Sequence, residues 1–173
     1  MSNKPFYTSL KPLYYLIIVI GLFSCGVYSF TGAKPCAECK TVSVQYFENL
    51  SSLGSPNLSQ QFTEALKDIL IRQSSLSLIN KNGDLAFEGN ITEFNVKPVS
   101  IQANETASLN RLTISVKVKY VNTKQPEQNF ERTFTRFSDF DSRKDFSQVE
   151  TQLVEDVNSQ LVQDIFNAAL SNW

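Results

Sequence analysis

The residues best suited to chemistry in this chain are its three cysteines, because none of the 173 residues is a histidine. Without an imidazole, a Ser-His-Asp or Cys-His catalytic device cannot be built, and neither can a histidine-ligated zinc or iron site. Three cysteines are too few for a four-thiolate cluster. The sequence therefore favours a binding or structural protein over an enzyme, and we expect no catalytic residues, no cofactor and no metal site.

The first cysteine, Cys25, ends a segment that has the layout of a bacterial lipoprotein signal. Lys4 and Lys11 make the start basic, residues 13–23 form an apolar run, and the run ends in Leu-Phe-Ser-Cys. A membrane-spanning helix needs about 20 apolar residues, so this run is too short for an anchor. We expect residues 1–24 to be removed and Cys25 to be acylated, with cleavage elsewhere or an uncleaved short anchor as the alternatives.

The other two cysteines form a C-x-x-C pair, Cys36 and Cys39, which falls at the end of a Gly- and Pro-containing stretch. In an oxidising envelope compartment such a pair can form a disulfide, although idle thiols fit equally well. A redox role is a more specific alternative, because a C-x-x-C pair can cycle between its thiol and disulfide states. A metal site is another alternative, which would need ligands from a partner chain. We expect residues 25–39 to be a tether, which places both thiols outside the core of a domain at 40–173.

Basic side chains recur on one side of the clearest strand in the sequence. Across residues 112–120, apolar residues alternate strictly with polar ones, so Arg111, Lys117 and Lys119 share one strand face. Lysine and arginine can pair with phosphates and other acidic groups of a ligand. The alternative is a solvated face whose lysines discourage edge pairing.

A second mixed cluster follows in the next strand, where Arg132 and Arg136 flank Phe134. One interpretation is that these residues contact a partner or a lipid. The alternative is that the phenylalanines of this strand belong to the hydrophobic core. Further on, three aspartates suggest calcium, but they lack the glycine and terminal glutamate of an EF-hand, so a charged loop is the simpler reading. They are Asp139, Asp141 and Asp145.

The elements that must position these residues follow from hydrophobic periodicity. Alternation predicts strands at 41–47, 76–79, 85–96, 112–120 and 130–137, with Gly89 marking a bulge or a close backbone approach. Helical spacing predicts amphipathic helices at 57–73 and from Ser147, which has capping-box spacing with Glu150, to the C-terminus. Loops are expected at 48–56, 97–108 and 138–145. The fold class is α+β, a two-layer sandwich with both helices on one face of a four- or five-stranded mixed sheet.

Several stretches resemble the LPS-assembly lipoprotein LptE in the form found in Bacteroidota, and together they cover most of residues 25–173. They are CGVYSFTG from Cys25, TVSVQYF from Thr41, LSQQFTEALKD from Leu58, FEGNIT from Phe87, NETASLNRLTISV from Asn104, RFSDFD from Arg136 and DIFNAALSNW from Asp164. The insert that contains Cys36 and Cys39 departs from this pattern, so the resemblance assigns that pair no role.

The resemblance implies a non-catalytic outer-membrane lipoprotein that is anchored by its N-terminal lipid and faces the periplasm. It implies two partners, a β-barrel of the LptD type and lipopolysaccharide, which the two proteins together move to the outer leaflet. The near-neutral charge, with 16 basic and 17 acidic residues, argues against nucleic acid as a partner. Two alternatives are an envelope lipoprotein adaptor of similar fold for another ligand or barrel, and a thiol-redox lipoprotein.

Overall fold

The computed structural model describes residue 36 and residues 38–99 and 108–170. All of them belong to one compact unit, Thr31–Trp173. The expected lipidation site Cys25 and its signal segment lie outside the described residues.

Within the described residues, six strands form one mixed sheet. Their bounds are β1 Thr41–Val44, β2 Glu48–Asn49, β3 Ser77–Leu78, β4 Leu85–Val99, β5 Leu109–Asn122 and β6 Phe130–Asp141. The strand order is β3-β1-β4-β5-β6, with β2 also paired to β4. Strands β1 and β2 run parallel to β4, whereas β4, β5 and β6 form an antiparallel meander. The expected mixed sheet is confirmed, with one strand more than the four or five expected, because β2 is only two residues long and lies inside a predicted loop.

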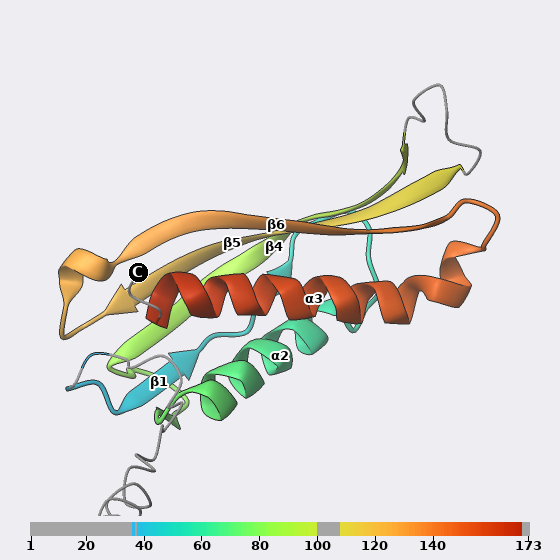
Figure 1. Ribbon diagram of the computed structural model, residues 1–173. Coiled ribbons are helices and arrows are strands. Elements are labelled where there is room, and N and C mark those ends of the chain that lie inside the picture. Colours follow the sequence, from blue (N-terminus) through green and yellow to red (C-terminus); the bar gives the residue numbers. More distant parts are fainter. Residues whose placement is uncertain (1–35, 37, 100–107, 171–173) are drawn as a thin grey trace, which may run out of the picture. The chain divides into compact units, whose positions relative to one another are not determined.

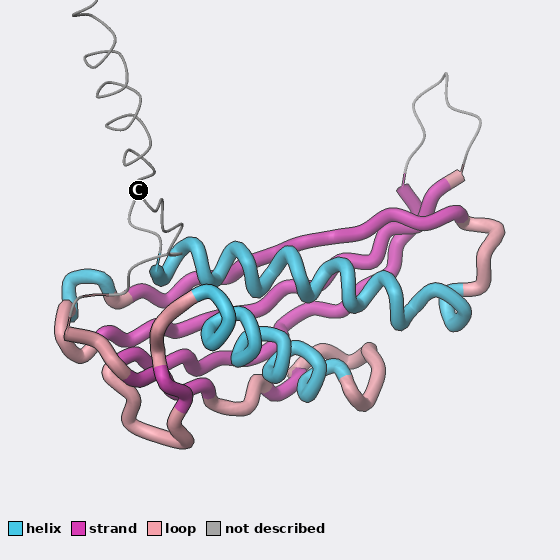
Figure 2. The backbone as a smooth tube through the Cα atoms, turned by 60° about the horizontal axis from the view of Figure 1, so that its bottom comes forward, coloured by secondary structure: helices cyan, strands magenta, loops and turns pink. Residues whose placement is uncertain are grey.

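Both helices cover the same face of this sheet, as Figures 1 and 2 show. Helix α2 spans Leu58–Gln73 and α3 spans Phe146–Leu170. The apolar stripe of α3 packs against β5 and β6, and that of α2 packs against β1, β2 and β3. On β5, the alternate residues Leu112, Ile114, Val116 and Val118 are completely buried. The predicted α+β two-layer sandwich is therefore confirmed, and the opposite face of the sheet is left uncovered by either helix.

The long hairpin reaches further than its polar sequence predicts. Pairing between β4 and β5 continues to Val99 and Leu109, and β6 continues to Asp141. The expected loops at 97–108 and 138–145 are therefore partly strand. Backbone pairing requires no apolar side chain, so polar residues at a hairpin end are read as loop when only periodicity is considered.

Gly89 lies where two strands of the sheet approach each other closely. A Cβ atom at this position would lie 2.0 Å from the carbonyl oxygen of Lys117 and 2.7 Å from the ring of Phe47. The expectation of a close approach is confirmed, while the bulge itself lies between Ile91 and Glu93.

The cap of α3 also differs from the expected one. The carboxylate of Asp145 accepts hydrogen bonds from the backbone N–H and the hydroxyl of Ser147, at 3.0 and 2.9 Å. The helix begins at Phe146, so Ser147 is already inside it and does not cap it. An acidic group at a helix N-terminus is favourable because free N–H groups point towards it.

Candidate functional site

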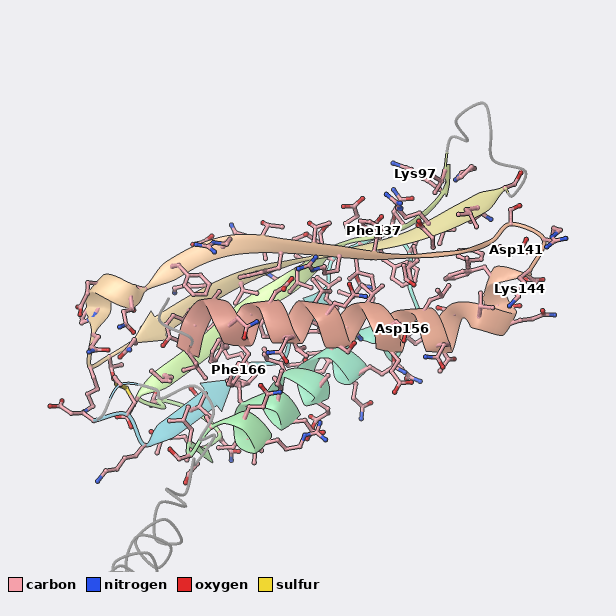
Figure 3. The ribbon with its side chains drawn as sticks, viewed as in Figure 1. Lys97, Phe137, Asp141, Lys144, Asp156 and Phe166 are labelled. Carbon is pink, nitrogen blue, oxygen red and sulfur yellow. A yellow bond between two sulfur atoms is a disulfide. The ribbon has the colours of Figure 1, made fainter. Side chains whose placement is uncertain are left out.

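The uncovered face of the sheet carries the predicted basic residues of β5. The antiparallel register places Arg111, Lys117 and Lys119 on the side opposite the buried residues Leu112 and Val118, as the alternation predicts. We call this surface the outer face and define it by the outward residues of β4 (88–97), β5 (111–119) and β6 (131–139). Figure 3 shows side chains standing on it, with Lys97 and Phe137 labelled.

Each of these three basic residues has an acidic partner on a neighbouring strand. Lys117 Nζ lies 2.5 Å from Glu131 Oε1, and Lys119 Nζ lies 3.4 Å from Glu88 Oε2. Arg111 donates two hydrogen bonds to Asp139, at 2.7 and 2.8 Å. These bonds lower the pKa of the Asp139 carboxyl and raise the pKa of Arg111. Lys117 likewise lowers the pKa of Glu131 through its hydrogen bond.

The outer face is consequently balanced in charge. Four basic and four acidic side chains share it, and Glu93 accepts a hydrogen bond of 2.9 Å from Ser115 at its centre. The eight are Lys97, Arg111, Lys117, Lys119, Glu88, Glu93, Glu131 and Asp139. The outer face is therefore basic when β5 is considered alone, but close to neutral when β4 and β6 are included.

A hollow of about 380 Å³ lies on this face beside Lys117 and Lys119. Tyr46, which is 57% exposed, and three glutamates also line it. The glutamates are Glu48, Glu88 and Glu131. With three carboxylates against two ammonium groups, the hollow offers an anion no net attraction.

On the outer face, the positive charge is least neutralised around Arg111, near the end of the β4–β5 hairpin. Lys97 stands opposite Arg111 in the register, and Asp139 is the one carboxylate paired there among the described residues. The Arg111 guanidinium also stacks on the ring of Phe137, 3.6 Å from its centroid, and this ring is 47% exposed. An exposed aromatic ring with two nearby cations suits a ligand that is both acidic and apolar.

Arg132 and Arg136 do not join this face. The register sets them opposite Val118 and Ile114, which places both on the side of the helices. Arg136 donates two hydrogen bonds to Asp164 of α3, which raise the pKa of Arg136. The Arg132 guanidinium lies 5.4 and 5.9 Å from the ring centroids of Phe130 and Phe134. The five predicted ligand residues are therefore divided between the two sides of the sheet.

The cysteine pair forms a disulfide between Cys36 and Cys39. Cys39 is only 6% exposed and belongs to the hydrophobic core, with its Sγ 3.7 Å from Asn122 Oδ1. The expectation that both thiols lie outside the core is therefore wrong for Cys39. The burial of Cys39 fits a structural disulfide, while the half-buried Cys36 is the sulfur that a thiol-redox partner would have to reach.

The three aspartates considered for calcium have separate tasks. Asp139 pairs with Arg111, Asp141 pairs with Arg143, and Asp145 caps α3. Across the described residues, no group of three or more acidic or cysteine side chains is arranged to hold a metal ion.

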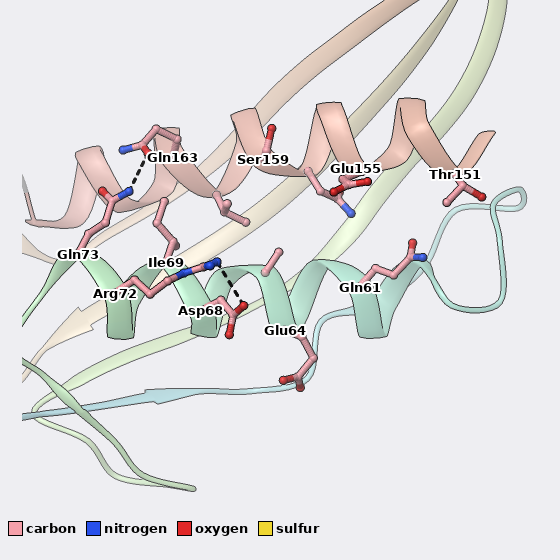
Figure 4. A pocket seen from close by; sticks show the side chains of 13 residues that line it. Gln61, Glu64, Asp68, Ile69, Arg72, Gln73, Thr151, Glu155, Ser159 and Gln163 are labelled. Carbon is pink, nitrogen blue, oxygen red and sulfur yellow. Dashed lines mark hydrogen bonds and ion pairs between the residues drawn. The ribbon is translucent and has the colours of Figure 1, made fainter. Parts of the chain in front are cut away.

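A groove between α2 and α3 is the feature that periodicity did not predict. It has a volume of about 610 Å³, and a hydrogen bond of 3.3 Å between Gln73 and Gln163 joins the helices at one end (Figure 4). Asn158 lines it and is only 3% exposed, yet its Oδ1 has no hydrogen-bond partner. The sequence did contain a signal, because Asn158 interrupts an apolar row of α3 at steps of four, between Val154 and Val162.

None of the described helices combines the length and apolar character that crossing a membrane requires.

A family model described as "LptE: Lipopolysaccharide-assembly" matches residues 39–169. This match spans the sheet and both helices. The chain belongs to the LptE family. Its first matched residue is Cys39, so Cys36 and the stretch before it lie outside the match. No curated protein sequence matches the chain.

One solved structure supports the fold of this LptE-family chain, and two others are less similar to it in structure. The hypothetical protein CT253 from Chlamydia trachomatis is 10% identical, with a TM-score of 0.54 over 78% of this chain and 99% of that one. A minor lipoprotein from Acinetobacter baumannii is 18% identical, with a TM-score of 0.44 over 75% and 93%. The uncharacterized lipoprotein B from Nitrosomonas europaea is 14% identical, with a TM-score of 0.45 over 76% and 81%.

Proposed function

We propose that the chain is a non-catalytic outer-membrane lipoprotein that supports assembly of an LptD-type β-barrel and takes part in moving lipopolysaccharide to the outer leaflet. The observation that carries this proposal is the family match, which covers both layers of the described domain. The paired charges of the outer face also fit a scaffold better than a reaction centre.

The partner is tested by affinity purification of the full chain from detergent-solubilised outer membranes. We expect an LptD-type barrel to copurify, and depletion of the chain to lower the amount of assembled barrel and raise envelope permeability. An unchanged barrel level after complete depletion would contradict the proposal. Recovery of a different barrel or ligand would instead assign the chain to the adaptor alternative.

Membrane attachment is proposed to rest on lipid at Cys25. Each buried CH₂ group contributes roughly 0.8 kcal/mol, so two or three acyl chains hold a protein firmly at a bilayer. Cys25→Ala should abolish incorporation of labelled fatty acid and release the chain from the membrane fraction. Retained label in this variant would show that the lipid is attached elsewhere or that the chain is held differently.

Lipopolysaccharide contact is proposed for the basic residues of the sheet, Arg111, Lys117 and Lys119, with Arg132 and Arg136 on the helix side. The best-supported position is Arg111, because Lys97 stands opposite it and an exposed Phe137 ring lies beneath its guanidinium. A phosphate group of the ligand can replace the Asp139 carboxylate as the acceptor of the two hydrogen bonds that Arg111 donates. Arg111→Gln should weaken binding of purified lipopolysaccharide about tenfold, whereas Arg143→Gln, which changes an exposed pair at Asp141, should not.

A further inference from the structure

We propose that the groove between α2 and α3 receives a basic side chain, arginine or lysine, from a polypeptide segment of the partner protein. This inference rests on the proposed function, because it takes the partner to be the barrel that the chain supports. Three features of the groove favour this occupant: an unsatisfied buried amide, an excess of negative charge, and an apolar floor.

The amide of Asn158 is the first feature. Its Oδ1 is the one buried side-chain oxygen or nitrogen in the described part of the chain without a hydrogen-bond partner. A buried polar group that makes no hydrogen bond lowers the stability of the fold, so this amide on an apolar row of α3 is destabilising. Rotation of the amide can present this oxygen to a donor that enters the groove, and a guanidinium or ammonium group carries several donors.

The charge of the groove is the second feature. Glu64 and Asp68 of α2 and Glu155 of α3 line it, with Arg72 as the one basic lining residue. Arg72 is paired with Asp68 at 3.2 Å, and Glu64 is paired with Lys67 at 2.8 Å. In the ranges that the structure covers, Glu155 has no ion-pair partner, and it lies three residues before Asn158 on the same helix. Residues at this spacing face the same way, so a carboxylate and an amide act together.

The wider helix surface has the same sign. Helix α3 contains four acidic residues and no lysine or arginine, which gives it a formal charge of −4. A basic segment would be attracted to it, and the attraction would weaken with salt. Ala65, Ile69 and Val162 form apolar lining between the polar rims, against which the methylene stem of a lysine or arginine can pack. The volume of about 610 Å³ is that of a side chain with its flanking backbone rather than of a whole helix.

The test is site-specific photo-crosslinking of the full chain in cells. The crosslinker replaces Ser159, which lines the groove, or Gln160, the next residue, which does not. We expect the crosslinker at position 159 to capture a barrel peptide that contains arginine or lysine within a few residues of the attachment point. The crosslinker at position 160 should capture it at least fivefold less.

Two substitutions separate a binding site from a packing defect. Asn158→Leu removes the unsatisfied amide, so the urea midpoint should stay equal or rise while the crosslink at position 159 falls at least fivefold. Glu155→Gln should lower the crosslink by a similar factor, and Glu150→Gln, an equal charge change on α3 outside the groove, should leave it unchanged. A higher urea midpoint with an unchanged crosslink would overturn the proposal and show that the amide is a defect only.

The two proposals fail in different ways. If the wild-type chain recovers the barrel and the groove variants recover it equally, only the groove assignment is overturned. If the crosslinker at position 159 captures a basic segment of another protein and no barrel is recovered, the groove assignment is supported and the proposed function is overturned. Absence of any protein crosslink at position 159, with the barrel recovered, overturns the groove assignment.

Discussion

The outer face of the sheet and the surface of α3 handle charge in opposite ways. On the outer face, Lys117 and Lys119 are each paired with a glutamate of a neighbouring strand, and four basic residues meet four acidic ones. On α3, four acidic residues occur without one basic residue, and Asp164 alone is paired within the described ranges, with Arg136 of β6.

This difference shows why a basic strand is weaker evidence for an anion site than its sequence suggests. Neighbouring strands stand about 4.8 Å apart, so side chains from three strands share one surface and can neutralise each other. A helix presents its charges mainly to its own neighbours at steps of three and four. A helix without basic residues therefore keeps its negative charge unless another element supplies a partner.

The largest expected effect concerns Gly89, which lies in the sheet that carries the outer face on one side and the helices on the other. Gly89→Ala would place a methyl group 2.0 Å from the carbonyl oxygen of Lys117, which is backbone and can move aside only if the strand itself shifts. We expect a loss of about 3 kcal/mol in the free energy of unfolding, measured by urea denaturation, because overpacking forces backbone shifts. Binding at the outer face and at the groove should fall together. Ala86→Ser, a small change in the same strand, serves as the control and should be well tolerated.

Reversal of the two lysines tests whether the balanced face binds an anionic glycolipid at all. Lys117→Glu with Lys119→Glu should lower affinity for purified lipopolysaccharide about tenfold at low salt, and less at high salt, where charges are screened. The effect on stability should be modest, because exposed ion pairs contribute about 0.2–1 kcal/mol each. Adding Glu131→Lys and Glu88→Lys restores the pairs with the charges exchanged. Equal affinities for the wild type and the double variant at both salt concentrations would show that these lysines are only part of a solvated face.

The disulfide belongs to neither surface, so its removal should leave both intact. Cys36→Ser with Cys39→Ser should cost about 1 kcal/mol, since the closed loop is short and one hydroxyl is placed in the core. Cys36→Ala with Cys39→Ala should cost less, because no polar group is buried. Thermal unfolding measures both variants. Loss of lipopolysaccharide export by folded, lipidated double variants would support the redox alternative.

Acid should destabilise the fold by protonating the Asp84 carboxylate, which hydrogen bonds keep ionised. Backbone hydrogen bonds from Lys40 and Thr41, and the hydroxyl of Thr41, lower the pKa of Asp84 to about 2. A lowered pKa contributes stability that is present above the normal value of about 4 and is lost as the pH falls towards 2. Asp84→Asn should therefore be less stable at pH 7 and show a shallower loss between pH 4 and 2. Parallel acid slopes for the variant and the wild type would contradict this assignment.

Much of the fold could be predicted from periodicity. Strict alternation fixed which residues of β5 face the helices, and steps of four located the buried row of α3. The missed details are those without a periodic signal. Strand β2 is two residues long and exists only through its pairing with β4, and the end of β6 at Asp141 is held by backbone bonds to β5.

The sequence by itself determined the absence of histidine chemistry, the two amphipathic helices and the common strand face of Arg111, Lys117 and Lys119. These properties depend on composition and on local geometry, which neighbouring residues of one strand or helix define. Only the tertiary structure decided that acidic side chains of β4 and β6 neutralise that face, that Arg136 binds Asp164, that Cys39 is buried and that Asn158 lines a groove. Each of these depends on which segments, distant in sequence, pack side by side, and strand register and helix docking set that arrangement.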